Sequence, residues 1–245
     1  MTAPLLACRD LVCGYGRPVL EGVTFDVGPG EIVALLGGSG CGKSTLLRTI
    51  TGLLPPLAGE VRVLGAPIYD LDAEARGQVL RRTGTAFQQD ALFGSMTVAD
   101  NIALPLRELT DLPEPVIREM VRMKLALVGL TGFERRAPAS LSGGQRKRAA
   151  LARATILDPD LVFCDEPSAG LDPVVAASID AALLQLRAVL GMGLVIVTHE
   201  LESIRAIADR AVMFGRGTLC AAGTIDELIA SRDRDVYTFF HPRSA

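Results

Sequence analysis

The sequence predicts a mixed α/β fold that begins with an antiparallel β part and carries a helical insertion. Three observations lead to this prediction: glycine-broken apolar runs near the N-terminus, a glycine-rich motif between a strand and a helix, and a central run of helices. At 245 residues, 49% of them hydrophobic, the chain can bury a large core. We expect one domain over residues 1–245, with a helical subdomain inserted at about 93–157.

The N-terminal part is expected to form strands. Between Pro4 and Val27, short apolar runs are broken by glycines, which is typical of hairpins in an antiparallel sheet. The apolar run EIVALL, Glu31 to Leu36, indicates a buried strand, and KSTLLRTI, Lys43 to Ile50, indicates a helix after it. The glycine-rich motif lies between these two elements.

A second set of elements leads into the helical insertion. A strand, a helix and a returning strand are expected at Glu60–Leu64, Asp72–Arg82 and Thr83–Gln88. Helices are then expected from Thr97 onward, at Glu114–Val128 and at Gly143–Leu157, the first with Thr97 and Asp100 as a capping pair. The prolines at 105, 113 and 138 are expected to separate these helices.

Strands and helices alternate again in the last third of the chain. The expected strands are Leu161–Cys164, Gly193–Thr198, Ala211–Phe214 and Thr218–Ala221. The expected helices are Pro173–Leu190, one from Glu200, and Thr224–Ala230, in which Glu227 follows Thr224 as in a capping box. This alternation predicts a mixed αβ core around the inserted helices.

The glycine-rich motif GGSGCGKS matches the pattern G-x-x-x-x-G-K-[ST]. Glycines allow backbone N–H groups to surround a phosphate closely, and the N-terminus of the next helix favours an anion. The flanking strand and helix argue against a simple glycine turn. The motif therefore predicts a nucleotide phosphate site made by Gly37, Gly38, Ser39, Gly40, Cys41, Gly42, Lys43, Ser44 and Thr45.

Two adjacent carboxylates follow the apolar strand LVFC. Because neighbouring side chains point to opposite sides of an extended backbone, Asp165 and Glu166 can take different roles. Magnesium prefers oxygen ligands, so Ser44 and Asp165 are expected to hold Mg²⁺ beside the phosphates. Glu166 is then free to polarise an attacking water; an ordinary acidic strand end is the alternative.

His199 follows the predicted core strand GLVIVT. A lone histidine is usually structural, but ligands of α/β folds gather at the carboxyl edge of such strands. An imidazole there can donate to a γ-phosphate and orient water. We therefore expect His199 to be functional, and we expect no such role for His241 in the polar tail.

The string LSGGQ, Leu141 to Gln145, predicts a second anion site. Ser142 can cap the following helix, and Gly143 and Gly144 leave its first amides unshielded. Its distance in sequence from the first motif suggests that it serves a phosphate bound elsewhere; a glycine-rich cap without a ligand is the alternative. The run Arg146 to Arg148 is expected to be a solvated or phosphate-attracting face.

Composition excludes several other classes of protein. The net charge is −3 and no basic run exceeds three residues, so nucleic acid is not an expected partner. No apolar stretch approaches the ~20 residues that cross a bilayer, and the N-terminus lacks the pattern of a signal peptide. The five cysteines, at 8, 13, 41, 164 and 220, have no metal-ligand spacing and are expected to be free thiols, with Cys41 sensitive to alkylation.

Taken together, these motifs resemble the nucleotide-binding subunit of ABC transporters. The resemblance rests on GGSGCGKS, AFQQD, LSGGQ, LVFCDE, SAGLD and VTHE, in that order, and it spans nearly the whole chain. It implies a P-loop NTPase core of RecA-like type with an antiparallel β subdomain and an inserted helical subdomain. It also implies ATP hydrolysis, with ATP and Mg²⁺ as cofactors.

The resemblance assigns further roles to single residues. It implies that Tyr15 stacks on adenine, that Lys43 binds the β- and γ-phosphates, and that Gln88 joins Ser44 and Asp165 around Mg²⁺. It makes Glu166 the catalytic base and His199 the switch histidine. Residues Ser142, Gly143, Gly144 and Gln145 would contact ATP held by a second copy in a head-to-tail dimer, and Asp172 would link the two sites.

Within this family, the stretch Ala91 to Pro113, above all PLRELTDLP, together with MKLALVGL at Met123 to Leu130, is similar to the ATPase of Mla-type phospholipid transport. This similarity implies a membrane permease, an MCE-domain lipid-binding protein and a small regulatory subunit as partners, and a cytoplasmic site at the inner membrane. Uptake of a small polar solute is the first alternative, and a soluble ABC protein acting on ribosomes or DNA is the second. The segment Asp233 to Phe240 is expected either to contact the second copy or to pack on its own domain.

Overall fold

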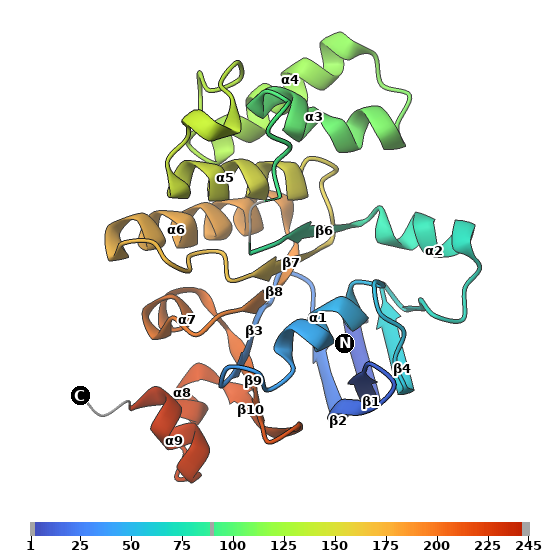
Figure 1. Cartoon of the computed structure of the whole chain (residues 1–245), viewed down its shortest axis with the longest axis vertical. Helices are drawn as coiled ribbons and strands as arrows, with labels where there is room; N and C mark the ends of the chain where they lie inside the picture. Colours follow the sequence, from blue (N-terminus) through green and yellow to red (C-terminus); the bar gives the residue numbers. More distant parts are fainter. Residues whose placement is uncertain (1–2, 89–90, 242–245) are drawn as a thin grey trace.

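The computed structural model describes residues 3–88 and 91–241. In this part of the chain one sheet of ten strands runs in the order β5-β4-β1-β2-β10-β9-β3-β8-β7-β6 (Figure 1). Its strands are β1 (Leu6–Gly14), β2 (Pro18–Val27), β3 (Ile32–Gly37), β4 (Ala58–Val63), β5 (Ala66–Pro67), β6 (Thr83–Ala86), β7 (Leu161–Asp165), β8 (Gly193–Val197), β9 (Arg210–Gly215) and β10 (Thr218–Thr224).

The sheet combines an antiparallel part with a parallel part. Strands β1, β2, β4 and β5 pair antiparallel, and the pairing of β1 with β2 confirms the hairpin predicted from the glycine-broken apolar runs. Strands β9, β3, β8, β7 and β6 are parallel, and β3 and β8 are buried at every position, as expected where both faces of a sheet are covered. Val197 is the partner of both Leu35 and Asp165, so β3, β7 and β8 end at one edge.

Helices cover the sheet and extend beyond it. Their bounds are α1 (Lys43–Ile50), α2 (Ala73–Leu80), α3 (Val98–Leu109), α4 (Glu114–Leu127), α5 (Gly143–Ala154), α6 (Pro173–Leu190), α7 (Leu201–Ile207), α8 (Ile225–Ile229) and α9 (Arg234–Phe240), with a 3-10 turn at Pro138–Ser140. Helices α3 and α4 lie farthest from the antiparallel strands, at one end of the molecule, and α5 lies between them and α6 (Figure 1).

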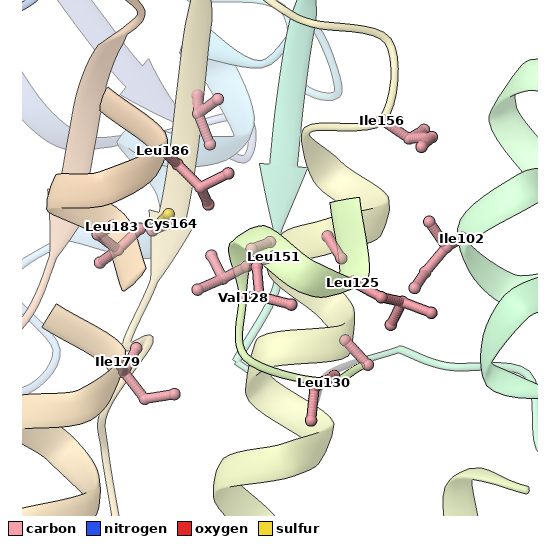
Figure 2. Packing of buried hydrophobic residues seen from close by; sticks show 14 of the residues in the cluster. Ile102, Leu125, Val128, Leu130, Leu151, Ile156, Cys164, Ile179, Leu183 and Leu186 are labelled. Atoms are coloured by element: carbon pink, nitrogen blue, oxygen red, sulfur yellow. The ribbon is translucent and has the colours of Figure 1, made fainter. Parts of the chain in front are cut away.

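The helical insertion shares its hydrophobic core with the parallel sheet. Ile102 of α3, Leu125 of α4 and Leu151 of α5 belong to the same buried cluster as Cys164 of β7 and Leu183 of α6 (Figure 2). Apolar side chains repeat along these helices at a helical period, which explains why one face of each is buried. Because the helices share this cluster, their packing is coupled to the strands that carry the site.

The caps predicted from the sequence are confirmed, and one proline prediction is wrong. Thr97 accepts a hydrogen bond from the amide of Asp100, and Thr224 and Glu227 form a reciprocal capping box. Pro105 does not separate helices but lies inside α3. A proline in a helix interior costs about 3 kcal/mol, and burial of Ile102 and Leu106 on the same helix offsets that cost.

Helix α6 is the one helix of the described residues that is long and apolar enough to cross a membrane by length and composition. The sequence prediction of no such stretch therefore needs this correction. In the structure α6 packs on the domain, with Ile179, Leu183 and Leu186 fully buried in the core cluster.

Candidate functional site

A cavity of about 690 Å³ opens where β3, β7 and β8 end. Its size suits a small-molecule ligand. It is lined by Gly37, Gly38, Ser39, Gly40, Gly42, Lys43, Ser44, Thr45, Gln88, Asp165, Glu166 and His199, together with Val19, Val197 and Phe239. Most of the residues that the sequence predicts to bind nucleotide or Mg²⁺ within one chain thus line the same cavity.

The loop between β3 and α1 has the geometry of an anion site. Gly42, the N-cap of α1, has a φ of 106° and no side chain that caps the helix, so the first amides of α1 remain open. The first turn contains no acidic residue, which leaves the positive end of the helix dipole uncompensated. At Gly37 a Cβ would lie 2.5 Å from the carbonyl oxygen of Phe214, so this position admits only glycine.

Lys43 brings a positive charge into this loop. Its Nζ donates to the carbonyl oxygens of Gly37 at 2.7 Å and Gly38 at 3.0 Å, and it lies 3.7 Å from Sγ of Cys41. An ammonium group attracts phosphate as a compact point charge. The loop therefore combines open amides with a cation, and both favour a phosphate chain.

Glu166 and His199 face each other across the ends of β7 and β8. Nδ1 of His199 lies 2.8 Å from Oε1 of Glu166. The Glu166 side chain is only 12% exposed, whereas that of His199 is 60% exposed. Oε2 of Glu166 is buried and has no hydrogen-bond partner among residues 3–88 and 91–241, so the carboxylate makes its recorded side-chain contact through Oε1.

The backbone of Glu166 holds its side chain in an unusual direction. Its φ of 51° is in the left-handed region, which is uncommon for a residue with a side chain. The Glu166 amide donates to the carbonyl oxygen of Val197 at 2.8 Å, which fixes this conformation against β8. The extended pair of carboxylates expected from the sequence is therefore wrong at Glu166, where the strand has ended and the chain turns.

Asp165, Ser44 and Gln88 line the same cavity and offer a carboxylate, a hydroxyl and an amide oxygen. Burial, and secondly the neighbouring Glu166 carboxylate, raise the pKa of Asp165 above its usual value. A cation beside Asp165 would offset both effects, and hard oxygen donors are what Mg²⁺ prefers. The described residues contain no cluster of three or more His, Cys, Asp or Glu side chains suited to a metal, so a magnesium ion here would need phosphate or water ligands as well.

Sequence reasoning missed the role of Lys147. The run after LSGGQ is not a solvated face: its three residues are half-buried, and Arg146 donates to the carbonyl oxygen of Leu141 at 2.7 Å. Nζ of Lys147 donates to the carbonyl oxygens of Gln88 at 2.5 Å and Glu166 at 3.3 Å. One cation on α5 thus joins two loops of the cavity, and only the tertiary structure reveals this contact.

The LSGGQ residues do not line the cavity. Ser142 accepts from the amide of Gln145, and the Gln145 side chain accepts from the amide of Ser142, so the predicted cap of α5 is confirmed. At Gly144 a Cβ would lie 2.3 Å from Cγ1 of Val175, which shows how closely α5 approaches α6. These residues, with Gly143, form a separate helix N-terminus, and any phosphate that they bind is not the one at Lys43.

Three other predicted residues lie outside the main cavity. Tyr15 is half exposed, and its hydroxyl accepts a hydrogen bond from Arg48 of α1. Cys41 lines an adjoining hollow beside the phosphate loop. Asp172 accepts from the amide of Val175 and caps α6. The structure therefore gives Asp172 a local structural role, whatever further role it has.

The C-terminal segment forms helix α9, which the sequence did not predict as a helix. Val236 and Phe240 are buried against Ala34 and Leu36 of β3, and Phe239 lines the main cavity. Tyr237 is half exposed and stacks on His241 with ring centroids 4.3 Å apart. This segment therefore packs on its own domain.

Comparison with known proteins agrees with this geometry. Residues 20–169 match the family model for ABC transporters. The chain is 41% identical over 236 residues to a probable ribonucleotide transport ATP-binding protein of Mycobacterium leprae, covering 96% of this chain and 68% of that protein. It is 39% identical over 245 residues to the intermembrane phospholipid transport system ATP-binding protein MlaF of Haemophilus influenzae, covering 100% and 93% of the two chains.

A solved structure shows the same fold with products bound. It is the dimeric post-hydrolysis state of an ATP-binding cassette with ADP and phosphate, 28% identical, with a TM-score of 0.81 over 90% of this chain and 98% of that one. The family match, the fold and the geometry of the phosphate loop thus all indicate an ATP-binding cassette. The chain belongs to the ABC transporter family, as an ATP-hydrolysing, ATP-binding subunit.

Proposed function

We propose that this ATPase drives a bacterial inner-membrane transporter that moves phospholipid between membranes. The observation that carries the proposal is the 39% identity to MlaF, which extends over the whole of this chain and 93% of that protein. A relative that matches end to end supports a shared role more strongly than a shared cassette alone. The similarity within PLRELTDLP, Pro105 to Pro113, supports the same substrate class.

In the proposed reaction the loop from Gly37 to Thr45 binds the ATP phosphates through backbone amides, and Lys43 neutralises the β- and γ-phosphates. Ser44, Gln88 and Asp165 would hold Mg²⁺, which supplies positive charge against the phosphates. Glu166 lines the cavity, and its carboxylate accepts the proton of the attacking water. His199 donates to the γ-phosphate while its Nδ1 stays on Glu166. Tyr15 stacks on adenine.

We further propose that two copies complete each other's sites. Ser142, Gly143, Gly144 and Gln145 lie outside the cavity of their own chain, and their helix N-terminus offers amides to a phosphate. In a head-to-tail dimer they would close over the ATP of the second copy, with Asp172 linking the two sites. The dimeric cassette with ADP and phosphate supports this arrangement.

The helical insertion, about residues 93–157, is the proposed contact for a membrane permease. Phe87 and Phe93, on either side of the stretch 89–90, are each about half exposed, as are Leu109 and Leu112 at slightly lower exposure. We assign these exposed apolar side chains to the contact with the permease. Through the permease the chain would lie on the cytoplasmic side of the inner membrane, with an MCE-domain protein and a small regulatory subunit as further partners.

The PLRELTDLP motif also has a structural role. Arg107 makes ion pairs with Asp100 at 3.0 Å and with Glu114 at 2.6 Å, so it ties α3 to the start of α4. Thr110 donates to the carbonyl oxygen of Leu106 at the end of α3. The motif therefore links the two helices of the proposed permease contact and leaves Leu109 and Leu112 at its surface.

Uptake of a small polar solute is the second candidate. It is favoured by the 41% identity to the probable ribonucleotide transport protein, of which this chain covers 68%. ATP hydrolysis can drive transport of either substrate, so the ATP site does not distinguish the two candidates. The two candidates differ in the partners that they require: a lipid-binding MCE protein in the first case and a periplasmic solute-binding protein in the second.

Purification of the native complex distinguishes the candidates. The full chain is affinity-purified with its membrane partners, and bound lipids and nucleotides are identified by mass spectrometry. We expect phospholipid and an MCE-domain partner, and ATP-dependent transfer of labelled phospholipid between vesicles. The Glu166→Gln complex is the control: it should keep its partners and lose transfer. A periplasmic sugar-, amino-acid- or nucleotide-binding partner without lipid would overturn the proposal.

A further inference from the structure

A buried polar cluster joins the segments that follow Glu166 and His199. Asp180 of α6, Ser203 of α7 and Ser168 of the loop after β7 are 6%, 6% and 2% exposed. Oγ of Ser203 donates to Oδ2 of Asp180 at 2.7 Å, and it lies 3.4 Å from Oγ of Ser168. Three elements that are distant in sequence are therefore joined by hydroxyl and carboxyl groups in the interior.

The surroundings of this cluster are mostly apolar. A cavity of about 10 Å³ beside it is lined by the three polar residues, by Thr198, and by the apolar residues Ala34, Pro167, Ile196, Ile204, Ile207 and Ala208. Oδ1 of Asp180 is buried and has no hydrogen-bond partner among the described residues. A buried carboxyl group with an unmet acceptor costs folding free energy. An apolar side chain would pack at this position without that cost. The role of the Asp180 carboxyl group is therefore to connect the segments that carry Ser168 and Ser203.

Two members of the cluster, Ser168 and Ser203, belong to segments that also carry a residue of the site. Ser168 follows Glu166 by two residues, in a turn closed by the amide of Ala169 on the Glu166 carbonyl oxygen at 3.3 Å. Ser203 is in the first turn of α7, which begins two residues after His199. Asp180 is on α6, so its carboxyl group is the anchor to which both segments are tied.

We propose that Asp180, Ser203 and Ser168 form a positioning bridge that holds Glu166 and His199 at their working distance. None of the three touches the nucleotide cavity, so they are positioning residues and not catalytic ones. Loss of the bridge lets α7 and the Glu166 turn shift independently. A displacement of about 1 Å at a reacting group can cost up to ~10²-fold in rate. The inference rests on the proposed roles of Glu166 and His199.

The test begins with Ser203→Ala in the full chain. We expect kcat for ATP hydrolysis to fall about 3- to 10-fold while KM for ATP stays within about two-fold, because positioning affects the transition state more than ground-state binding. Ser178→Ala is the matched control, since within residues 3–88 and 91–241 the hydroxyl of this half-buried serine of α6 donates only to the carbonyl oxygen of Val175. Equal kcat values for the two variants would overturn the bridge.

A merely structural role is excluded by a second comparison. If Ser203 acts through His199, Ser203→Ala should lower the single-turnover rate much less in a His199→Ala background than in the unmodified chain. The same loss in both backgrounds would overturn the proposal. Asp180→Asn, which keeps an oxygen acceptor for Ser203, should retain kcat, whereas Asp180→Leu should lower it as Ser203→Ala does.

Two further outcomes keep the interpretation clear. If Ser203→Ala does not fold, Ser168→Ala tests the bridge from the Glu166 side, with the same expected loss in kcat, and a normal kcat would overturn the bridge. If Glu166→Gln and His199→Ala themselves leave hydrolysis unchanged, the assigned roles of the pair fail, and that failure is distinct from any result on the three bridge residues.

Discussion

Nδ1 of His199 lies 2.8 Å from Oε1 of Glu166, and this contact joins the ends of two neighbouring parallel strands. The register explains it: Asp165 of β7 is the partner of Val197 of β8, so the next residues of both strands emerge side by side. A carboxylate at Glu166 would accept a hydrogen bond from Nδ1–H, while Nε2 on the other side of the ring lies 3.7 Å from Oε1 of Glu200. The pair therefore couples the orientation of the imidazole to the charge of the carboxylate.

Glu166→Gln should keep ATP binding and lower turnover by at least ~10²-fold, because glutamine preserves the shape of the side chain but cannot accept a proton. ATP-dependent dimers should then accumulate, which size-exclusion chromatography measures. Glu202→Gln, a change of the same kind in the first turn of α7, is the control and should hydrolyse ATP normally. Unchanged steady-state hydrolysis in the Glu166 variant would remove this residue from the base role.

Lys147→Met should lower kcat by roughly 10-fold, because charge-assisted hydrogen bonds to Gln88 and Glu166 are each worth about 1.5–3 kcal/mol and only part of that energy reaches the transition state. ATP affinity, measured with a fluorescent analogue, should change little, since Lys147 does not line the cavity. Lys147→Arg should recover part of the rate. Normal kcat in the methionine variant would argue that the two loops hold their positions without this contact.

Asp158→Asn should lower the free energy of unfolding by about 1–3 kcal/mol, because it leaves the buried ammonium group of Lys124 without its charged partner. Nζ of Lys124 lies 2.6 Å from Oδ1 of Asp158, and the lysine is 5% exposed. Asparagine tolerates the left-handed backbone at this position, where φ is 49°.

Asp160→Asn is the matched control for that change. It breaks the exposed pair with Arg82, 2.8 Å apart, and should cost only about 0–1 kcal/mol. Urea unfolding of both variants measures the difference. Equal losses would mean that burial of Lys124 does not strengthen its ion pair.

Asp180 should make stability depend on pH. Burial raises the pKa of Asp180 in the folded state, and the hydrogen bond from Ser203 opposes this shift only in part. The folded state therefore holds this proton more tightly than the unfolded state does. The resulting stability is fully present below the unfolded pKa of about 3.9 and is lost as pH rises through the folded pKa.

The measurement for Asp180 is the free energy of unfolding at several pH values from about 4 to 7. Relative to Asp180→Asn, which does not titrate, the unmodified chain should lose stability as pH rises over this window. The comparison uses the slope, because the amide also changes the hydrogen bonds of the cluster. Parallel curves would show that Asp180 has the same pKa in both states.

Several elements could be predicted because their signals are local. The strand before the phosphate loop is a continuous apolar run, and the helix after it begins at the motif itself, so β3 and α1 differ little from the expected ranges. The caps at Thr97, Ser142 and Thr224 depend on residues three apart and were equally readable. Helix α9 was missed because its seven residues, RDVYTFF, are too few to show a clear periodicity, and burial of Val236 and Phe240 decides its conformation.

The sequence by itself determined the chemistry of the site: a phosphate loop, two carboxylates, a histidine and a second glycine-rich helix start, each carried by a short motif. The tertiary structure decided how these parts are related. It turned Glu166 toward His199, placed Lys147 between two loops, and buried Asp180 beside Ser203. Motifs consist of neighbouring residues and can be recognised in the sequence alone, whereas contacts between residues 20 to 60 positions apart depend on how strands and helices pack.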